Sequence, residues 1–283
     1  MTPSPPAPVF SSTSAGPSVR SPRRSIGGAI VRRLRRILRP LLIPLRDWQA
    51  PRLHHWMMHE ASLPMTLSHK SALIVAPHHD DETFGCGGLI ALKRQAGVEV
   101  RIVIVTDGRQ SHSHIEGLDG DQLMRTRKDE ALRAAALLGV SPRDVLFLDL
   151  PDQGLTHLEE SLRRRGILQI AELLRAFDPG ELYMNHPLDC HPDHEAVYRL
   201  IDAASAQAGV APDVYCYPIW LLWKGEFRLS LHPSELAGAL RLDVRSVQAV
   251  KDQAIGVYIS QMPVLPKGFV NQFQQGYEVF FRK

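Results

Sequence analysis

A short apolar run followed at once by five ionisable residues is the feature that most limits how this chain can fold. Ala72–Ala76 is rich in branched apolar side chains and is bounded by Pro77, which predicts a buried strand of a parallel sheet. The residues that follow, His78–Glu82, cannot continue a core strand, because buried charges are costly unless they are paired or bind a metal. We therefore expect them at the carboxyl end of the strand, where open α/β sheets place their ligands.

A second cluster of polar residues lies about a hundred positions later. Asn185–His194 follows the apolar segment Leu182–Met184 and precedes a helical pattern. Two strand ends can deliver both clusters to one point, and the result is a site of mixed nitrogen and oxygen donors. Imidazole and carboxylate suit zinc, and three protein ligands leave one position open for water.

The rest of the chain alternates between apolar runs and amphipathic segments, which predicts an α/β fold. We expect a Rossmann-like three-layer sandwich with a mostly parallel sheet over residues 71–283, preceded by a linker at 47–70. Three glycines, at 85, 87 and 88, predict a tight turn before a helix that starts at Leu89. Further strands are expected at 98–105, 145–148, 182–184, 214–217 and 276–281, and further helices at 121–138, 161–177 and 192–208.

The first 46 residues differ from the rest in charge. They contain nine of the 33 basic residues and none of the 30 acidic ones, so the remainder has 24 basic and 30 acidic residues. We expect a disordered Arg-rich arm with a short amphipathic helix, and no nucleic-acid-binding body. Residues 28–46 fit peripheral contact with an anionic membrane; a solvated or docked arm and a transit peptide are the alternatives.

The location of the protein follows from its cysteines and its apolar runs. Three cysteines do not form a disulfide framework, which indicates a reducing compartment. No run reaches the roughly 18 apolar residues that a spanning helix needs. We therefore expect a cytoplasmic protein, with peripheral contact at the inner face of the membrane if the arm binds it.

Two short motifs carry a resemblance to a known family. Pro77–Glu82 is similar to the motif Pro-His-Pro-Asp-Asp-Glu, and His191–His194 reads His-Pro-Asp-His. Both motifs resemble those of LmbE-like, or PIG-L-like, zinc-dependent N-acetylglucosaminyl deacetylases. The chain departs from the pattern at His79, where the family usually has proline. The resemblance extends over roughly residues 71–281.

This resemblance implies a metal site with three protein ligands. His78, Asp81 and His194 would bind one Zn²⁺ per chain, although other divalent metals can occupy a mixed histidine and aspartate site. Cys190 is an alternative ligand or nucleophile. Only three ligands are implied, whereas structural zinc sites usually have four, so a catalytic site is favoured.

The remaining roles are also implied by the resemblance. Asp80 would be the general base, and His191 would protonate the leaving amine with Asp193 as its orienting partner. Arg127 would contact substrate; the alternative is a surface pair with a neighbouring glutamate. Asp152, in a Pro-Asp-Gln-Gly loop, would orient part of the site. The role of Glu82 stays open between orienting a ligand and forming a salt bridge.

The expected function is hydrolysis of the acetyl group from an N-acetylated amino sugar or sugar conjugate. One alternative is a zinc amidase that acts on a larger or non-sugar amide. Another is a catalytically silent, metal-holding module tethered to a membrane. The other histidines near these motifs are expected to be ordinary solvated residues; they are His54, His55, His59, His112 and His114. The sequence does not fix the sugar or the oligomeric state.

Overall fold

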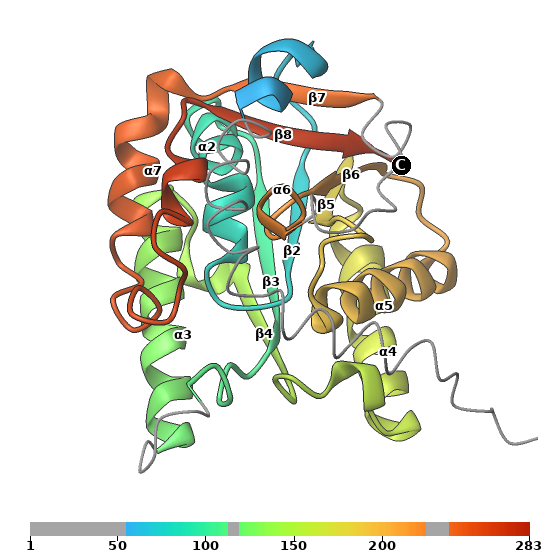
Figure 1. Cartoon of the computed structure of the whole chain (residues 1–283). Coiled ribbons are helices and arrows are strands. Elements are labelled where there is room, and N and C mark those ends of the chain that lie inside the picture. The colour runs from blue at the N-terminus through green and yellow to red at the C-terminus, as the bar shows by residue number, and fades with distance from the viewer. Residues whose placement is uncertain (1–54, 113–118, 225–237) are drawn as a thin grey trace, which may run out of the picture. The chain divides into compact units, whose positions relative to one another are not determined.

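A single mixed sheet organises the computed structural model, which describes residues 55–112, 119–224 and 238–283. These residues belong to one compact unit, Pro44–Lys283. The described strands pair in the order β1-β7-β8-β6-β5-β2-β3-β4 (Figure 1). Only β8 runs antiparallel to its neighbours β6 and β7, which confirms the mostly parallel sheet. The strands are β1 (Leu63–Met65), β2 (Ala72–Ala76), β3 (Val100–Thr106), β4 (Val145–Leu150), β5 (Glu181–Asn185), β6 (Asp213–Tyr217), β7 (Ala239–Asp243) and β8 (Tyr277–Arg282).

Helices cover both faces of this sheet and complete the expected three layers. Along β2, Ile74 packs into one hydrophobic core and Leu73 and Val75 into the other, as the two-residue period of a strand requires. The first core includes α2 (Asp81–Gln95), α3 (Gly120–Leu137) and α7 (Gln248–Ile255); the second includes α4 (Glu160–Phe177) and α5 (Pro192–Ala208) (Figure 1). A short α6 (Leu221–Lys224) follows β6. Within the described part of the chain, no helix has the length and hydropathy needed to cross a bilayer.

The order of the strands brings the two motifs to the same edge. From β2 the chain adds β3 and β4 on one side, and it then returns to place β5 on the other side of β2. Strands β2 and β5 are parallel, with Ala72 opposite Glu181, so their carboxyl ends lie together. This reversal of strand order is where doubly wound sheets bind their ligands.

Helix α2 corrects the expectation for the three glycines. The helix begins at Asp81, directly after the first motif, and the glycines lie inside it. A Cβ atom at Gly85 would lie 2.3 Å from Cδ2 of Tyr217, and one at Gly88 would lie 2.5 Å from Cγ1 of Val244. These glycines therefore allow neighbouring side chains to approach the helix closely, and they do not form a turn.

We expect Gly85→Ala to lower the free energy of unfolding by about 1–3 kcal/mol, the usual cost of overpacking. The Tyr217 ring cannot move aside freely, because its hydroxyl donates to the carbonyl of Val75 at 2.7 Å. Urea denaturation measures the effect, with Gly256→Ala as a control, since its Cβ would meet no atom closer than 3.4 Å. Equal stability of the two variants would contradict the close approach.

Two buried ion pairs hold α2 in place. The Lys251 ammonium lies 2.7 Å from Glu278, which also accepts the backbone N–H of Gly88 at 2.6 Å. Nearer the C-terminal end of the helix, Lys93 pairs with Glu181 at 2.7 Å. All four charges are buried, but each has a partner of opposite charge, so no charge carries the full cost of desolvation. Together they fix the helix whose first residue is Asp81.

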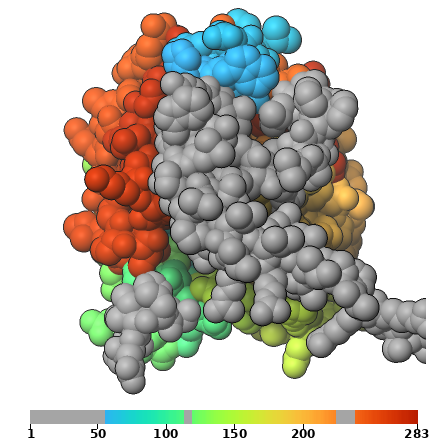
Figure 2. All heavy atoms as spheres, in the orientation of Figure 1, coloured from blue at the N-terminus to red at the C-terminus, as the bar shows by residue number. Residues whose placement is uncertain are grey.

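The linker expected at 47–70 is partly built into the fold. Strand β1 pairs in parallel with β7, with Leu63 opposite Leu240. Figure 2 shows the blue residues that begin the described chain beside the orange and red C-terminal residues. Strand β7, helix α7 and a short π-helical turn at Met57–Ala61 were not expected. The expected arm at residues 1–46 lies outside the described residues.

Candidate metal centre

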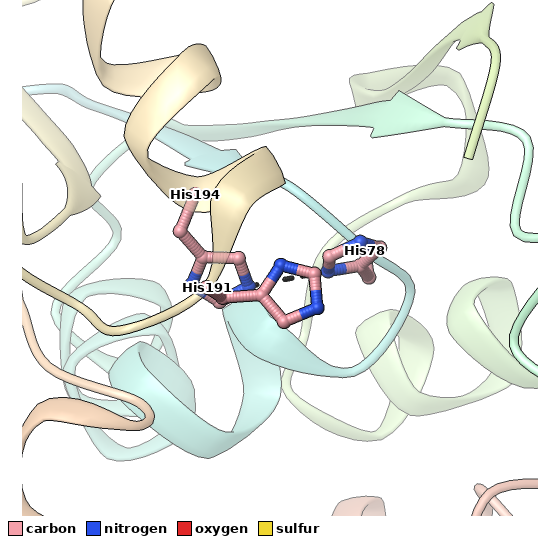
Figure 3. A group of neighbouring side chains, drawn as sticks. All are labelled: His78, His191 and His194. Atoms are coloured by element: carbon pink, nitrogen blue, oxygen red, sulfur yellow. Dashed lines mark hydrogen bonds between the residues drawn. The ribbon is translucent and has the colours of Figure 1, made fainter. Parts of the chain in front are cut away.

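Three side-chain atoms at the carboxyl edge of β2 and β5 form a nearly equilateral triangle. His78 Nδ1 lies 3.2 Å from Asp81 Oδ2 and 3.2 Å from His194 Nε2. His194 Nε2 lies 3.2 Å from the same Asp81 oxygen. Figure 3 shows His78, from the loop after β2, facing His194 in the first turn of α5. The structure thus brings together the three residues predicted as metal ligands.

The size and charge of this triangle fit one zinc ion. Zinc–ligand bonds of about 2.0–2.1 Å in a tetrahedron place neighbouring donor atoms about 3.3 Å apart. Burial disfavours a charged imidazole at His194, but Asp81 and Asp189 outweigh it and raise its pKa to about 9. Burial opposes charge at His78 too, and hydrogen bonds to Asp152, Asp193 and Asp81 raise its pKa well above the usual value. The surrounding carboxylates therefore favour positive charge inside the triangle, and a bound cation would supply that charge.

Asp189 orients the ligand His194. Its Oδ2 lies 2.6 Å from His194 Nδ1, so the other nitrogen, Nε2, is directed into the triangle. The second oxygen, Oδ1, accepts the backbone N–H groups of Ile219, Trp220 and Leu221, each at 2.8 Å. Such a carboxylate–histidine contact fixes the tautomer and increases the basicity of a metal-binding imidazole.

We expect Asp189→Asn to weaken metal affinity by about 10-fold to 100-fold, the usual effect of removing such a carboxylate. An amide can still accept the three N–H groups but does not favour the same charge on His194. Competition with a chromophoric chelator measures the affinity, and the exposed Asp129→Asn serves as control. Wild-type affinity in the Asp189 variant would remove its orienting role.

Two carboxylates lie against the other nitrogen of His78. Nε2 is 3.4 Å from Asp152 Oδ1 and 3.4 Å from Asp193 Oδ2. Asp193 is held by the backbone N–H of Gln153, which donates to it at 2.7 Å. Burial opposes ionisation of Asp152, yet the contact with His78 lowers its pKa to about 2. The structure thus adds a contact of the Asp193 carboxylate with His78 that the sequence did not suggest, and the role of Asp193 toward His191 stays a prediction.

His191 lies beside the triangle as the N-cap of α5. Its Nδ1 accepts the backbone N–H of Asp193 at 3.3 Å, which satisfies one of the free donors at the helix start. In the neutral ring this contact leaves the proton on Nε2. The ligand atoms of His78, His191 and His194 all lie within 4.8 Å of one another, so His191 is close to any bound ion (Figure 3).

Asp80 has a strained backbone next to the metal ligands. Its φ is 125° and its ψ is −31°, a region that costs of order 1–3 kcal/mol for a residue with a side chain. Glu82 holds this conformation by accepting the Asp80 N–H at 3.1 Å, and Tyr258 donates to Glu82. Burial, and then the charge of Asp81, raise the pKa of Asp80 well above its usual value. Glu82 thus fixes Asp80 through hydrogen bonds, and it forms no salt bridge with the residues that the structure describes.

Arg127 is buried at 2% exposure, so the alternative of a surface pair is wrong. Its guanidinium donates to the carbonyl of His79 at 2.9 Å and lies 3.8 Å from Asp80 Oδ2. Glu130 instead accepts the N–H and hydroxyl of Ser260, at 2.8 and 2.6 Å. Arg127 therefore supports the strained turn and lines the site as well.

Two further histidines, His112 and His79, are buried in the structure. His112 is buried and its Nε2 lies 2.8 Å from the carbonyl of Ser260, so the expectation of a solvated residue was wrong. His79 stacks on Phe147 with ring centroids 5.5 Å apart, and no described residue hydrogen-bonds its nitrogens. Burial, and then Arg127, lower its pKa well below the usual value, so a neutral ring fills the place of the family's proline. His55 and His59 are exposed as expected; His54 and His114 lie outside the described residues.

Six of the eight predicted site residues line one cavity of about 310 Å³, and Asp193 and His194 lie behind them, outside its lining. Its volume falls in the range of small-molecule sites. No site role was assigned from the sequence to its apolar wall or to the polar residues Ser111, Gln153 and Gln261. The lining residues are His78, Asp80, Asp81, Phe84, Ser111, Arg127, Asp152, Gln153, His191, Ile219, Trp220, Gln261, Val264, Leu265 and Phe269.

The fold and the site define an α/β protein with a cluster of histidines and aspartates at the carboxyl edge of its sheet that could hold a metal ion. A comparison with known protein families finds the family that the two sequence motifs resemble. Residues 73–205 match the family described as PIG-L: GlcNAc-PI de-N-acetylase.

Individual relatives match only part of the chain. Diacetylchitobiose deacetylase of Thermococcus kodakarensis is 31% identical over 140 residues, which are 48% of this chain and 49% of that protein. The 4-oxalmesaconate hydratase of Pseudomonas putida is 30% identical over 128 residues, 44% of this chain and 46% of that protein. The chain thus spans about half the length of these two relatives. A solved deacetylase of the teicoplanin biosynthetic pathway shares the fold, with a TM-score of 0.59 at 20% identity over 75% of this chain and 97% of that one.

Proposed function

We propose that this chain is a metal-dependent hydrolase that removes the acetyl group from an N-acetylated amino sugar or sugar conjugate. The observation that carries the proposal is the triangle of His78, Asp81 and His194, of which His78 and Asp81 line a cavity together with Asp80 and His191. The family of residues 73–205 and the similarity to a diacetylchitobiose deacetylase support the choice of substrate.

The residues of the chain can be given roles in amide hydrolysis. When bound, zinc supplies a Lewis acid that polarises a carbonyl and makes water more acidic; a different divalent ion in this site would do the same. Asp80 takes the proton of the attacking water as the new C–O bond forms. His191 gives the proton of its Nε2 to the amine nitrogen as the C–N bond breaks, and the proton taken up by Asp80 replaces it, so that the histidine ends neutral and the aspartate ends ionised. The products are acetate and the free amine. Arg127 positions the substrate. Asp152 positions His78, the proposed metal ligand.

The alternatives are less well supported by the cavity. A silent metal-holding module has no need of an acid and a base beside its ligands, and a structural zinc site usually has a fourth protein ligand. An amidase for larger amides would use the same groups, so only its substrates distinguish it.

A hydratase is a second candidate, because one relative is named as 4-oxalmesaconate hydratase. A substrate with several carboxylates would require several cationic groups in the cavity. Among the described residues that line the cavity, Arg127 is the single arginine or lysine, whereas three aspartates line the same space. This balance of charge favours a neutral acetamido substrate.

A panel assay separates these functions. We expect the purified, zinc-loaded chain to release acetate from N-acetylglucosamine compounds, as measured by proton NMR. Hydration of an unsaturated polycarboxylate without acetate release would favour the hydratase, and absence of both reactions would refute catalysis by this site on these substrates. Release of a larger acyl group from a non-sugar amide alone would favour the amidase.

The cytoplasmic location and the membrane contact through residues 28–46 remain proposals from the sequence. We expect deletion of residues 1–46, with their nine arginines, to reduce binding to anionic vesicles and to leave acetate release unchanged. Vesicle sedimentation at low and high salt measures binding, since electrostatic attraction weakens as salt is added. Equal sedimentation of both proteins would end the proposal of a membrane-binding arm.

A further inference from the structure

Gln261, in the loop after α7, is a buried polar residue of the cavity that has no role in the proposed mechanism. Three serine or glutamine side chains line the described cavity, namely Ser111, Gln153 and Gln261. Gln153 is exposed and Ser111 is partly buried, whereas Gln261 is only 3% exposed. A buried polar group in a binding cavity contributes to specificity, because a ligand that leaves it without a hydrogen bond binds less well.

The backbone and the side chain of Gln261 are both held in place. Its backbone N–H donates to the carbonyl of Tyr258 at 3.0 Å, and its own carbonyl accepts the N–H of Val264 at 3.1 Å. Its Nε2 donates to the hydroxyl of Ser260 at 2.7 Å. The carbonyl of Ser260 in turn lies 2.8 Å from Nε2 of His112. Gln261 therefore has a fixed orientation before any substrate binds.

The hydrogen bonds of Ser260 decide which end of the Gln261 amide faces the cavity. The Ser260 hydroxyl donates its single proton to Oε2 of Glu130 at 2.6 Å, and Oε1 of the same carboxylate accepts the Ser260 N–H at 2.8 Å. A hydroxyl whose proton is used can only accept from a further partner, so that partner is the amide NH₂ group of Gln261. No described residue donates to the amide oxygen Oε1 of Gln261, and this oxygen is not sealed from solvent, so it opens on the cavity.

An N-acetylated amino sugar has two kinds of donor for this oxygen, the amide N–H and the hydroxyl groups of the ring. In the proposed mechanism the amide carbonyl lies at the metal ligands, and the amide nitrogen faces His191. Gln261 is instead linked through Ser260 to Glu130 on α3. Glu130 lies three residues after Arg127, so these two side chains share one face of the helix. This position, one helical turn from Arg127, favours a hydroxyl of the ring.

We propose that Gln261 is a specificity residue whose Oε1 accepts a hydrogen bond from a ring hydroxyl of the N-acetylated amino sugar. The proposal rests on the deacetylase function proposed above, and it adds a chemical requirement to that function. A site built to bind a hydroxyl rejects an analogue that lacks it, because the buried acceptor is then left unpaired. The requirement concerns one hydroxyl of the ring, and the contact is lost when either partner is removed.

The test compares the methyl glycoside of N-acetylglucosamine with its 3-deoxy, 4-deoxy and 6-deoxy analogues, in the wild type and in Gln261→Met. Methionine keeps the length of the side chain without the amide. For one analogue we expect kcat/KM in the wild type to fall by about 5-fold to 100-fold, the cost of an unpaired buried acceptor. Gln261→Met lowers kcat/KM for the parent glycoside by a similar factor and removes the penalty of that analogue alone. Gln207→Met, at an exposed glutamine of α5, is the matched control and keeps the wild-type pattern.

The outcomes separate this inference from the function on which it rests. If every analogue loses the same factor in Gln261→Met as in the wild type while acetate is released, the hydroxyl contact is refuted and the deacetylase stands. The oxygen then meets the amide N–H or water only. Unchanged kcat/KM for the parent glycoside in Gln261→Met refutes the contact as well.

If no glycoside releases acetate, the proposed function fails on these substrates, and binding decides the contact alone. Ligand-observed NMR titration measures the affinity of the same four glycosides for the wild type and Gln261→Met. We then expect one analogue to bind the wild type more weakly than the parent glycoside and to bind the variant equally well. Independent losses from the analogue and the variant, or no binding of any glycoside to the wild type, would overturn the inference.

Discussion

Replacing Asp80 by asparagine is expected to lower kcat by about 100-fold to 10,000-fold, the range attributed to a positioned acid or base. The carboxylate is buried at 7% exposure in the cavity, next to the ligand Asp81, and is the side chain proposed to accept the proton of water. Asparagine preserves the shape of the residue and tolerates positive φ better than most residues. The loss should therefore come from chemistry and not from collapse of the turn.

The measurement is the rate of acetate release under saturating substrate, together with metal content by elemental analysis. Asp149→Asn is a matched control, because Asp149 also has a positive φ of 52° and lies on the surface beside Lys128. We expect the control to retain wild-type turnover and the Asp80 variant to retain its metal. Wild-type kcat in the Asp80 variant would show that another group takes the proton.

Replacing His194 by alanine is expected to abolish metal binding, with a loss of affinity of more than about 100-fold, which exceeds the usual effect of losing an orienting group. His194 supplies one corner of the ligand triangle and is fully buried. Its removal also leaves the buried carboxylates of Asp81 and Asp189 without their shared partner. His194→Gln fills more of the space and serves as a second variant if the alanine protein does not fold.

Elemental analysis after dialysis gives the metal content, and circular dichroism checks the fold. His157→Ala is the control, because His157 is an exposed histidine outside the cavity. One ion per chain in a folded His194 variant would refute its assignment as a ligand.

Much of the fold could be read from the sequence, because its strands are short apolar runs in the interior of a parallel sheet. Strand β2 was predicted with its observed bounds, and α5 begins at Pro192, where proline favours a helix start. Strand β7 was missed because its buried and partly buried residues do not form a continuous apolar run. Helix α2 was predicted to start too late because glycines usually signal turns, and the close approach of Tyr217 is a tertiary contact.

The candidate site shows the same division. His78, Asp81 and His194 belong to short motifs at strand ends, so their proximity follows from the pairing of β2 with β5. The partner of a side chain does not follow from spacing, and for this reason the contact of Asp193 with His78 was not predicted. Asp189 could have been considered as an orienting group, because it lies within the second motif five residues before a ligand. Leu265 had no such signal, since it reaches the cavity only through the packing of the loop after α7.

The most direct test of the metal centre is reconstitution of the metal-free protein with zinc while acetate release from an N-acetylglucosamine glycoside is followed. The triangle of His78, Asp81 and His194 predicts that activity rises with added zinc and reaches its plateau at about one equivalent per chain. Full activity before any metal is added, or zinc bound at one equivalent without any release of acetate, would contradict the account.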